Sequence, residues 1–334
     1  MCEIPLLLAF IVLVALVFDF TNGAHDCANA IASVVSTKVV TPRFAVTAAA
    51  VLNLVGALLG TEVARTLGSG IVLPHVVESS QLLVLAALLA AIAWNCITWY
   101  FGIPSSSSHA LIGGLIGAAI ADAGLDALNV QGIVSKVLIP LIAAPLAGFT
   151  GGFLCMWAMY WIFCRVHRHV VNVLFRRLQL CSAAFMATSH GLNDAQKTMG
   201  IVTLALFIFG QTESMDVPLW VKLSCAGSMA LGTALGGWKI VRTMGSRIFK
   251  LEPVHGFTAE SSATMVIAAA STLGCPVSTT HTISACIFGV GSVKRLSAVR
   301  WNVAVNLVTA WVLTLPAAAS VGFVSWEILH IFWG

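Results

Sequence analysis

Apolar stretches recur along the whole chain, and each is about twenty residues or longer, enough to cross a hydrocarbon layer about 30 Å thick as a helix. A Gly-x-Pro turn interrupts two of them, at 79–121 and 258–291, so each of these is expected to be a helical hairpin with a broken tip. Continuous spans are expected at 4–37, 44–64, 133–163, 181–209, 218–238 and 302–332. The pattern predicts an all-α polytopic protein that is multi-pass in the cell (inner) membrane.

Composition supports a membrane protein, because 59% of the residues are hydrophobic and only 9% are charged, against roughly 25% charged in an ordinary soluble domain. The nine cysteines are scattered through apolar stretches without a Cys-x-x-Cys pair. Neither a disulfide framework nor a zinc site is therefore expected. The lipid bilayer is the expected surrounding, and nucleic acid is not an expected partner.

The charged loops predict an orientation. Lys and Arg concentrate around 38–43, 165–177, 239–250 and 294–300, which places these loops in the cytoplasm. The loops at 122–126 and 213–216 are acidic or mixed and fall on the other side, where Arg65 is a charge that fits poorly. Sides alternate only if each interrupted stretch enters and leaves on the same side. Two hairpins of opposite orientation are therefore expected, with both chain termini outside the cytoplasm.

The chain also contains an internal repeat. The segment 22–26 resembles 190–194, and the segment 102–109 resembles 274–281, at nearly equal intervals. Three full spans and a hairpin per copy make an odd number of crossings, so the second copy is expected to be inverted. Two inverted-topology repeats with interrupted helices are typical of secondary transporters. The expected division is a first repeat at 1–163, a basic cytoplasmic linker at 164–180 and a second repeat at 181–334.

The two Ser-rich turns predict an anion site. Proline suits the first turn of a helix and serine is a good N-cap, so a half-helix should begin at each turn. Its free N–H groups and the hydroxyls form a neutral cradle for an oxyanion at membrane depth. The alternative is that these hydroxyls only cap and pack helices. The expected anion-binding residues are Ser105, Ser106, Ser107, Ser108, Ser278, Thr279 and Thr280.

The two acidic motifs predict coupling sites. Asp26 and Asp194 lie in apolar surroundings, where an ionised carboxylate is costly and usually functional. Asn29 and Lys197 follow them at i, i+3, on the same helical face. Oxygen ligands suit a cation such as Na⁺, whereas a carboxylate can equally carry a proton. The Lys197 ammonium would occupy a cation site, which favours proton coupling. The alternative is that each Asp pairs with a neighbour to fix helix packing.

Other titratable residues stand near these motifs. His190, His109 and His281 are candidates for a proton relay or for structural hydrogen bonds. Glu260 opens the second hairpin and is a candidate coupling carboxylate, with an interfacial position as the alternative. An intramembrane hydrolase is the competing class of function. The serines come as a run of donors without one nucleophile beside a base, so no enzyme and no cofactor are expected.

With the two Ser-rich turns, the segments Phe18–Ala30 and Ser189–Gly200 resemble the PiT family of inorganic phosphate transporters, in particular its bacterial low-affinity branch. The resemblance covers essentially the whole chain. It implies symport of inorganic phosphate with H⁺ or Na⁺, sometimes with phosphate carried as a neutral complex with a divalent metal. It also implies an inverted-repeat fold that commonly forms a homodimer.

Residue by residue, the resemblance assigns Asp26, Asn29 and Asp194 to the coupling ion, the hydroxyls of both turns to the anion, and adds weight to Glu260 and His190. Two departures disfavour sodium, because Asn53 stands where sodium-coupled animal members carry glutamate, and Lys197 where they carry asparagine. The family includes sulfate permeases. Sulfate or another tetrahedral oxyanion, and Na⁺-coupled phosphate symport, therefore stay open as alternatives.

Overall fold

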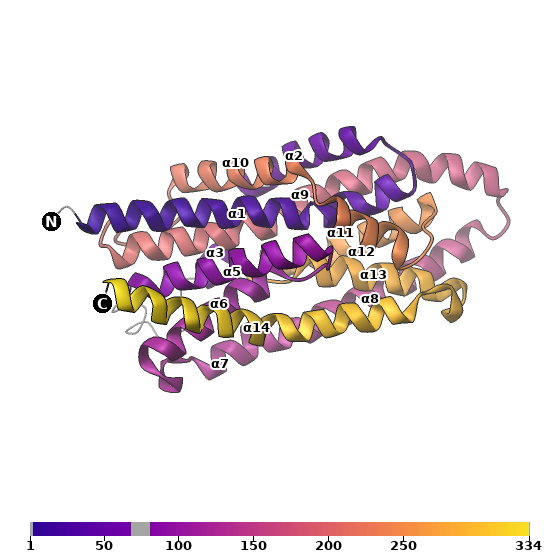
Figure 1. Cartoon of the computed structure of the whole chain (residues 1–334). Coiled ribbons are helices and arrows are strands. Elements are labelled where there is room, and N and C mark those ends of the chain that lie inside the picture. The colour runs from indigo at the N-terminus through magenta and orange to yellow at the C-terminus, as the bar shows by residue number, and fades with distance from the viewer. Residues whose placement is uncertain (1–2, 68–80, 334) are drawn as a thin grey trace.

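The computed structural model describes residues 3–67 and 81–333, and these form a bundle of long helices without a β-strand among them (Figure 1). The long helices are α1 (Glu3–Ser36), α2 (Pro42–Leu58), α5 (Gln81–Phe101), α6 (Ser107–Ala123), α8 (Ile139–Phe163), α9 (Arg168–Ile208), α10 (Leu219–Leu235), α12 (Pro253–Thr272), α13 (Thr279–Lys294) and α14 (Trp301–Trp333). The short ones are α3 (Glu62–Leu67), α7 (Val130–Ile133) and α11 (Trp238–Arg242).

Within the described part of the chain, five helices are long and apolar enough to cross a membrane. They cover Leu6–Ser36, Leu82–Phe101, Val130–Phe163, Arg168–Ile208 and Trp301–Trp333. Three shorter apolar helices, α2, α6 and α10, pack among them. The prediction of an all-α, multi-pass membrane protein is confirmed.

Several element boundaries differ from the expected ones, three of them for a clear local reason. The span expected at 44–64 ends at Leu58 and is followed by the separate short helix α3. The span expected from 181 begins at Arg168, because the basic first turns of α9 also carry Phe175, which is buried against Phe163 and Phe257. The second hairpin begins at Pro253, where Glu252 and His255 form a capping box. Residues 79–80 of the first expected hairpin lie outside the described residues.

Both broken hairpins are present, and their turns are built alike. Gly102 and Gly274 end the first arms with φ of 69° and 67°, a left-handed conformation that favours glycine. The second arms then begin at N-caps. The Ser106 hydroxyl accepts a hydrogen bond from the His109 amide at 3.2 Å, and Ser278 accepts from the His281 amide at 3.2 Å.

The helices run in the directions that an inverted repeat requires. In Figure 1, α1 and α9 cross the bundle in opposite directions, and the two hairpins enter from opposite ends. Their tips meet inside, since the rings of His109 and His281 lie 4.9 Å apart. Trp311 of α14 contacts both tips, because its indole stacks on His281 and donates to the Pro104 carbonyl at 3.1 Å. The arrangement is consistent with an inverted repeat. The division at 163 and 181 stays a prediction.

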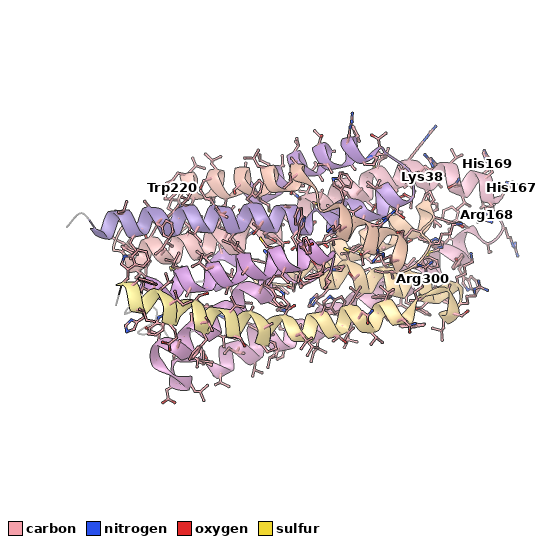
Figure 2. All side chains as sticks on the ribbon, viewed as in Figure 1. Lys38, His167, Arg168, His169, Trp220 and Arg300 are labelled. Carbon is pink, nitrogen blue, oxygen red and sulfur yellow. The ribbon has the colours of Figure 1, made fainter. Side chains whose placement is uncertain are left out.

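Charge separates the two ends of the bundle. Figure 2 places Lys38, Arg168 and Arg300 at the end opposite both termini. The misfit noted for Arg65 has a local explanation, because its guanidinium donates to Asp216 at 2.7 Å in the loop before α10. That hydrogen bond holds the pKa of the Asp216 carboxyl below its usual range.

Candidate functional site

The predicted site residues of both repeats meet in the middle of the bundle. The hairpin tips lie against the central turns of α1 and α9, and two apolar clusters enclose this polar centre from either end. All of the expected hydroxyl-bearing residues are at most 6% exposed, and so are Asp26, Asn29, Asp194 and Lys197. Burial of so many polar groups demands partners for them.

The hydroxyls pair with the acids in a repeated pattern. Ser107 donates to Asp26 Oδ2 at 2.8 Å, and its counterpart Thr279 donates to Asp194 Oδ2 at 2.9 Å. The next residue on each tip reaches the other repeat. Thr280 accepts from Asn29 Nδ2 at 2.9 Å, as Ser108 accepts from the Lys197 ammonium. Each hairpin tip therefore connects both acidic motifs.

Asn29 links the carboxylates of Asp26 and Asp194 through hydrogen bonds to Thr279 and Thr280. Its amide donates to Thr279 at 3.1 Å as well as to Thr280, and Thr280 in turn donates to Asp26 Oδ1 at 3.2 Å. A change at Asp26 can therefore reach Asp194 through one carboxamide and two hydroxyls.

All three N–H bonds of the Lys197 ammonium have hydrogen-bond acceptors. The ammonium contacts Asp194 Oδ1, the Ser108 hydroxyl and, at 3.1 Å, the Val277 carbonyl. An ammonium has three N–H bonds, and here each has an acceptor. The side chain is 1% exposed, so a fixed positive charge stands in the centre of the site.

Histidines complete the surroundings of both acids. His190 Nε2 lies 2.9 Å from Asp194 Oδ2, and its Nδ1 lies 3.1 Å from Asn53 Oδ1. His25 Nδ1 lies 2.7 Å from Asp26 Oδ1. His25 lies in the segment Phe18–Ala30, and in the sequence only its position next to Asp26 suggests a role.

The remaining hydroxyls serve other contacts. Ser105 donates to Thr98 at 3.0 Å, and Thr98 lies 3.0 Å from His25 Nε2. The sequence did not single out Thr98, which stands with Asn95 in a mostly apolar stretch. The side chains of Ser106 and Ser278 are engaged as N-caps.

The expected relay histidines of the hairpins occupy a packed aromatic stack. The rings of His281 and Trp311 are stacked with centroids 4.2 Å apart, and the His109 ring lies 4.9 Å from that of His281. They hold the two tips together, whereas His190 contacts a site carboxylate directly.

Glu260 lies apart from the centre. Its carboxylate accepts from Ser33, from Ser182 and, at 3.2 Å, from Gln179 Nε2, and the side chain is fully buried. Gln179 also accepts from the Thr37 hydroxyl at 2.8 Å. Glu260 thus belongs to a second polar cluster, between the central site and the basic end.

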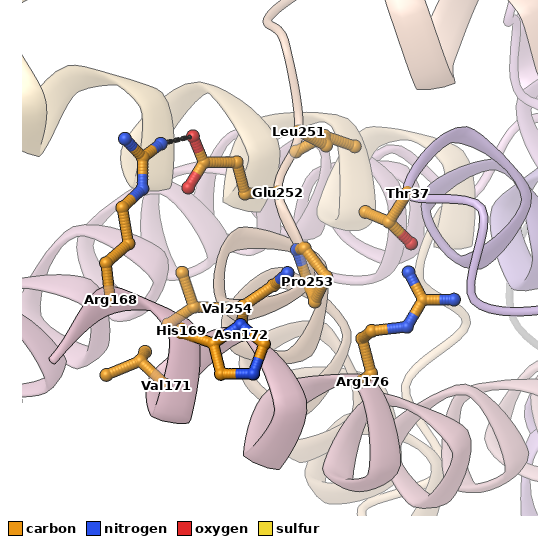
Figure 3. A pocket seen from close by; sticks show the side chains of 10 residues that line it. All are labelled: Thr37, Arg168, His169, Val171, Asn172, Arg176, Leu251, Glu252, Pro253 and Val254. Atoms are coloured by element: carbon orange, nitrogen blue, oxygen red, sulfur yellow. Dashed lines mark hydrogen bonds and ion pairs between the residues drawn. The ribbon is translucent and has the colours of Figure 1, made fainter.

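A cavity of about 470 Å³ opens at that basic end (Figure 3). Arg168 closes one side of it through an ion pair with Glu252 at 2.6 Å, and Arg176 donates to the Lys38 carbonyl at 2.8 Å. Because Thr37 lines the cavity, the Glu260 cluster begins at its wall. The lining residues are Thr37, Arg168, His169, Val171, Asn172, Arg176, Leu251, Glu252, Pro253 and Val254.

One group in the described structure could hold a metal ion. Asp26, His190 and Asp194 each offer a donor atom, and these atoms lie within 4.8 Å of one another. A divalent cation there would stand beside the Lys197 ammonium, whose charge opposes it. The donor set fits a metal that arrives together with an anion better than it fits a bare ion.

Comparison with known proteins identifies a family for this chain. Residues 22–322 match the model of the Phosphate transporter family. A relative from Bacillus subtilis (strain 168), named "Probable low-affinity inorganic phosphate transporter", is 48% identical over 327 residues, which are 98% of each chain. One of the same name from Rhizobium meliloti (strain 1021) is 50% identical over 94% of each chain. A solved structure named "The sodium-dependent phosphate transporter" has a TM-score of 0.89 at 23% identity, over 97% of this chain and 99% of the other.

Proposed function

This chain belongs to the Phosphate transporter family and is an inorganic phosphate transporter of the cell membrane, and from that premise we propose that it works as a proton-coupled symporter. The observation that supports proton coupling is the saturated Lys197 ammonium beside Asp194. A tethered cation fills the space in which a mobile Na⁺ would need oxygen ligands. The protonatable groups around it are Asp26 and His190.

The hydrogen bonds suggest how proton and phosphate binding are linked. Ser107 and Thr280 now donate to the Asp26 carboxylate. Protonation of Asp26 removes both the negative charge that repels an anion and the acceptor that holds these hydroxyls. The hydroxyls then turn to phosphate oxygens, with Lys197 supplying a compensating charge. Each partner therefore favours binding of the other, as symport requires.

The side chains beyond the centre fit a route for release. Glu260 and its partners stand between the site and the cavity at the basic end. We assign Glu260 as a further proton acceptor on that side.

Sodium coupling is the second candidate, because the similar solved structure is named a sodium-dependent phosphate transporter. Labelled phosphate uptake into proteoliposomes separates the two. An inside-alkaline pH gradient without Na⁺ should drive accumulation, whereas a Na⁺ gradient at equal pH should not. Accumulation that needs Na⁺ and ignores the pH gradient would overturn the proposal.

The same assay tests the cargo. Unlabelled phosphate should inhibit uptake far more strongly than an equal concentration of sulfate, and equal inhibition would make this a general oxyanion permease. We also propose that phosphate travels as a neutral complex with a divalent cation, whose metal would face His190 and Asp194 while Asp26 carries the proton. Chelation of divalent cations should then reduce uptake several-fold, and unchanged uptake would remove the metal from the cargo. The homodimer implied by the resemblance is likewise a proposal.

A further inference from the structure

A line of buried polar residues on α1 extends beyond the transport site in both directions. Asp19, Asn22, Asp26, Asn29 and Ser33 follow one another at intervals of three and four residues, which places them on one helical face. Each is at most 2% exposed. Toward the basic end this line reaches Glu260 through Ser33. Toward the other end it terminates at a second carboxylate, Asp19, for which the transport site gives no role.

Asp19 is buried with few partners. It is fully inaccessible, and its Oδ1 accepts one hydrogen bond, from the Thr198 hydroxyl of α9 at 2.8 Å. Its Oδ2 has no well-formed hydrogen bond among the described residues, and the same holds for both amide atoms of Asn22, whose side chain nevertheless lies close enough to interact with the Asp19 carboxylate. Apolar residues such as Ala15 and Phe18 surround this group. Three polar atoms without a well-formed hydrogen bond, on one helical face inside an apolar cluster, call for a functional explanation.

The charged groups that face Asp19 do not compensate the negative charge of an ionised carboxylate. From α9 come Asp194 and Lys197, and from α10 comes the thiol of Cys225. The three N–H bonds of the Lys197 ammonium are donated to Ser108, Asp194 and Val277, so none reaches Asp19. The facing stretch of α5, at 82–95, carries no titratable side chain, and Asp26 on α1 is itself acidic. An ionised Asp19 would thus be a poorly compensated charge at membrane depth, whereas a protonated carboxyl is neutral.

The position of Asp19 along α1 shows on which side of the transport site it lies. It precedes Asp26 by two helical turns, about 10 Å along α1, toward the end that carries both termini (Figure 1). The basic loops lie at the opposite end (Figure 2), and basic loops are retained in the cytoplasm. Asp19 therefore lies between the outer face and the transport site, with Asn22, a donor and an acceptor, on the way.

We propose that Asp19 is the outer proton-binding site of the transporter. The carboxylate takes one proton from the outer side to become a neutral carboxyl and passes the same proton on toward Asp26. The proposal rests on proton-coupled symport and names the group that loads the proton. Asp19 and Glu260 would then flank the central site as proton carriers on its two sides.

The decisive variant is Asp19→Asn, which keeps the shape of the side chain and removes its titration. Two activities are measured in proteoliposomes, namely accumulation of labelled phosphate driven by a pH gradient, and exchange of labelled for unlabelled phosphate at equal concentration and equal pH. Accumulation should fall at least tenfold, while exchange, which needs no net proton movement, should stay within about threefold of the unaltered protein. Asp126→Asn, at an exposed loop position, is the matched control and should change neither.

A second variant keeps the carboxyl and alters its environment. Thr198→Val removes the hydrogen bond that favours the ionised form, so the pH of half-maximal accumulation should rise. Its exchange activity should persist.

The outcomes separate the two proposals. If the unaltered protein accumulates phosphate on a pH gradient and Asp19→Asn does so equally well, Asp19 is not a proton site, and proton symport stands. Equal loss of accumulation and exchange, with an unshifted pH profile in Thr198→Val, would give Asp19 a structural role. If the unaltered protein responds to Na⁺ alone, proton symport itself is wrong.

Discussion

A single hydroxyl in this site can accept one hydrogen bond and donate another, which explains why the motifs are rich in Ser and Thr. Thr280 accepts from Asn29 and donates to Asp26, and a hydroxyl can do both because it has one donor and two acceptor positions. When its partner changes protonation, the hydroxyl can rotate toward an anion without moving the backbone. A carboxamide or an ammonium at the same position would be fixed in its role.

Thr280→Val should therefore reduce phosphate transport at least tenfold, because the variant keeps the shape and loses the hydrogen bonds to Asn29 and Asp26. Thr282→Val is the control, since the Thr282 hydroxyl only donates to the Ser278 carbonyl of its own helix. Initial rates of labelled phosphate uptake compare the two. Similar losses in both variants would contradict a specific role for the Thr280 hydroxyl.

The composition of the site was largely predictable, whereas its connections were not. Ser107, Thr279 and both acids stand in motifs whose repetition is visible in the sequence. Thr98 carries no such signal, because one threonine in an apolar stretch becomes informative only when folding brings it to His25. Glu260 was identified by its charge, but its distance from the centre follows from tertiary packing alone.

Lys197→Asn makes the second motif resemble the first. Loss of the tethered ammonium leaves Asp194 with His190 and Thr279, and opens a position lined by oxygen atoms. Uptake driven by a pH gradient should fall by about tenfold or more, and the residual uptake should become stimulated by Na⁺. Uptake is measured with and without Na⁺ at fixed pH. Residual uptake that is indifferent to Na⁺ would show that Lys197 does not replace a cation.

At the scale of elements, two matched crossings hold the acidic motifs in place. A Cβ atom on Gly23 of α1 would lie 2.3 Å from the Met229 carbonyl of α10. On α9, a Cβ on Gly191 would lie 2.1 Å from the Asn53 carbonyl of α2. Each glycine lets two backbones approach closely beside its repeat's aspartate. The crossings thus set the positions of Asp26 and Asp194 relative to the hairpin tips.

Gly191→Ala should separate α9 from α2 and disturb the contact between His190 and Asn53. Overpacking of this kind costs about 1–3 kcal/mol, so the melting temperature in detergent should fall by several degrees. Gly227→Ala is a matched control, because no neighbouring atom lies within 4 Å of an added Cβ there and alanine favours the helix. Thermal unfolding of both variants measures the difference. An unchanged melting temperature for Gly191→Ala would mean that this crossing is not tightly constrained.

Helix positions followed from the sequence wherever hydropathy alone decides them, as for α1, α8 and α14. The break after Leu58 and the early start of α9 at Arg168 did not. Hydropathy reports the length of chain that lipid accepts, but helices end where caps and packing end them, and the polar first turns of α9 project beyond the apolar region.

At the scale of the whole molecule, the orientation in the membrane decides in which direction the proposed proton route runs. The basic loops at one end and the mixed loops at the other predict that the end with Arg168 faces the cytoplasm. Cys164 is exposed beside that loop, and Ser214 is exposed in the loop before α10 at the opposite end. These two positions can therefore report on the two sides of the membrane.

A variant that retains Cys164 as its only cysteine should react with a membrane-impermeant maleimide only after the cells are permeabilised. Ser214→Cys, in a background without other cysteines, should react in intact cells. Phosphate uptake by each variant confirms that the labelled protein is folded. Reversal of the two labelling patterns would place Asp19 on the cytoplasmic side of the transport site, and Glu260 would then be the carboxylate that meets external protons first.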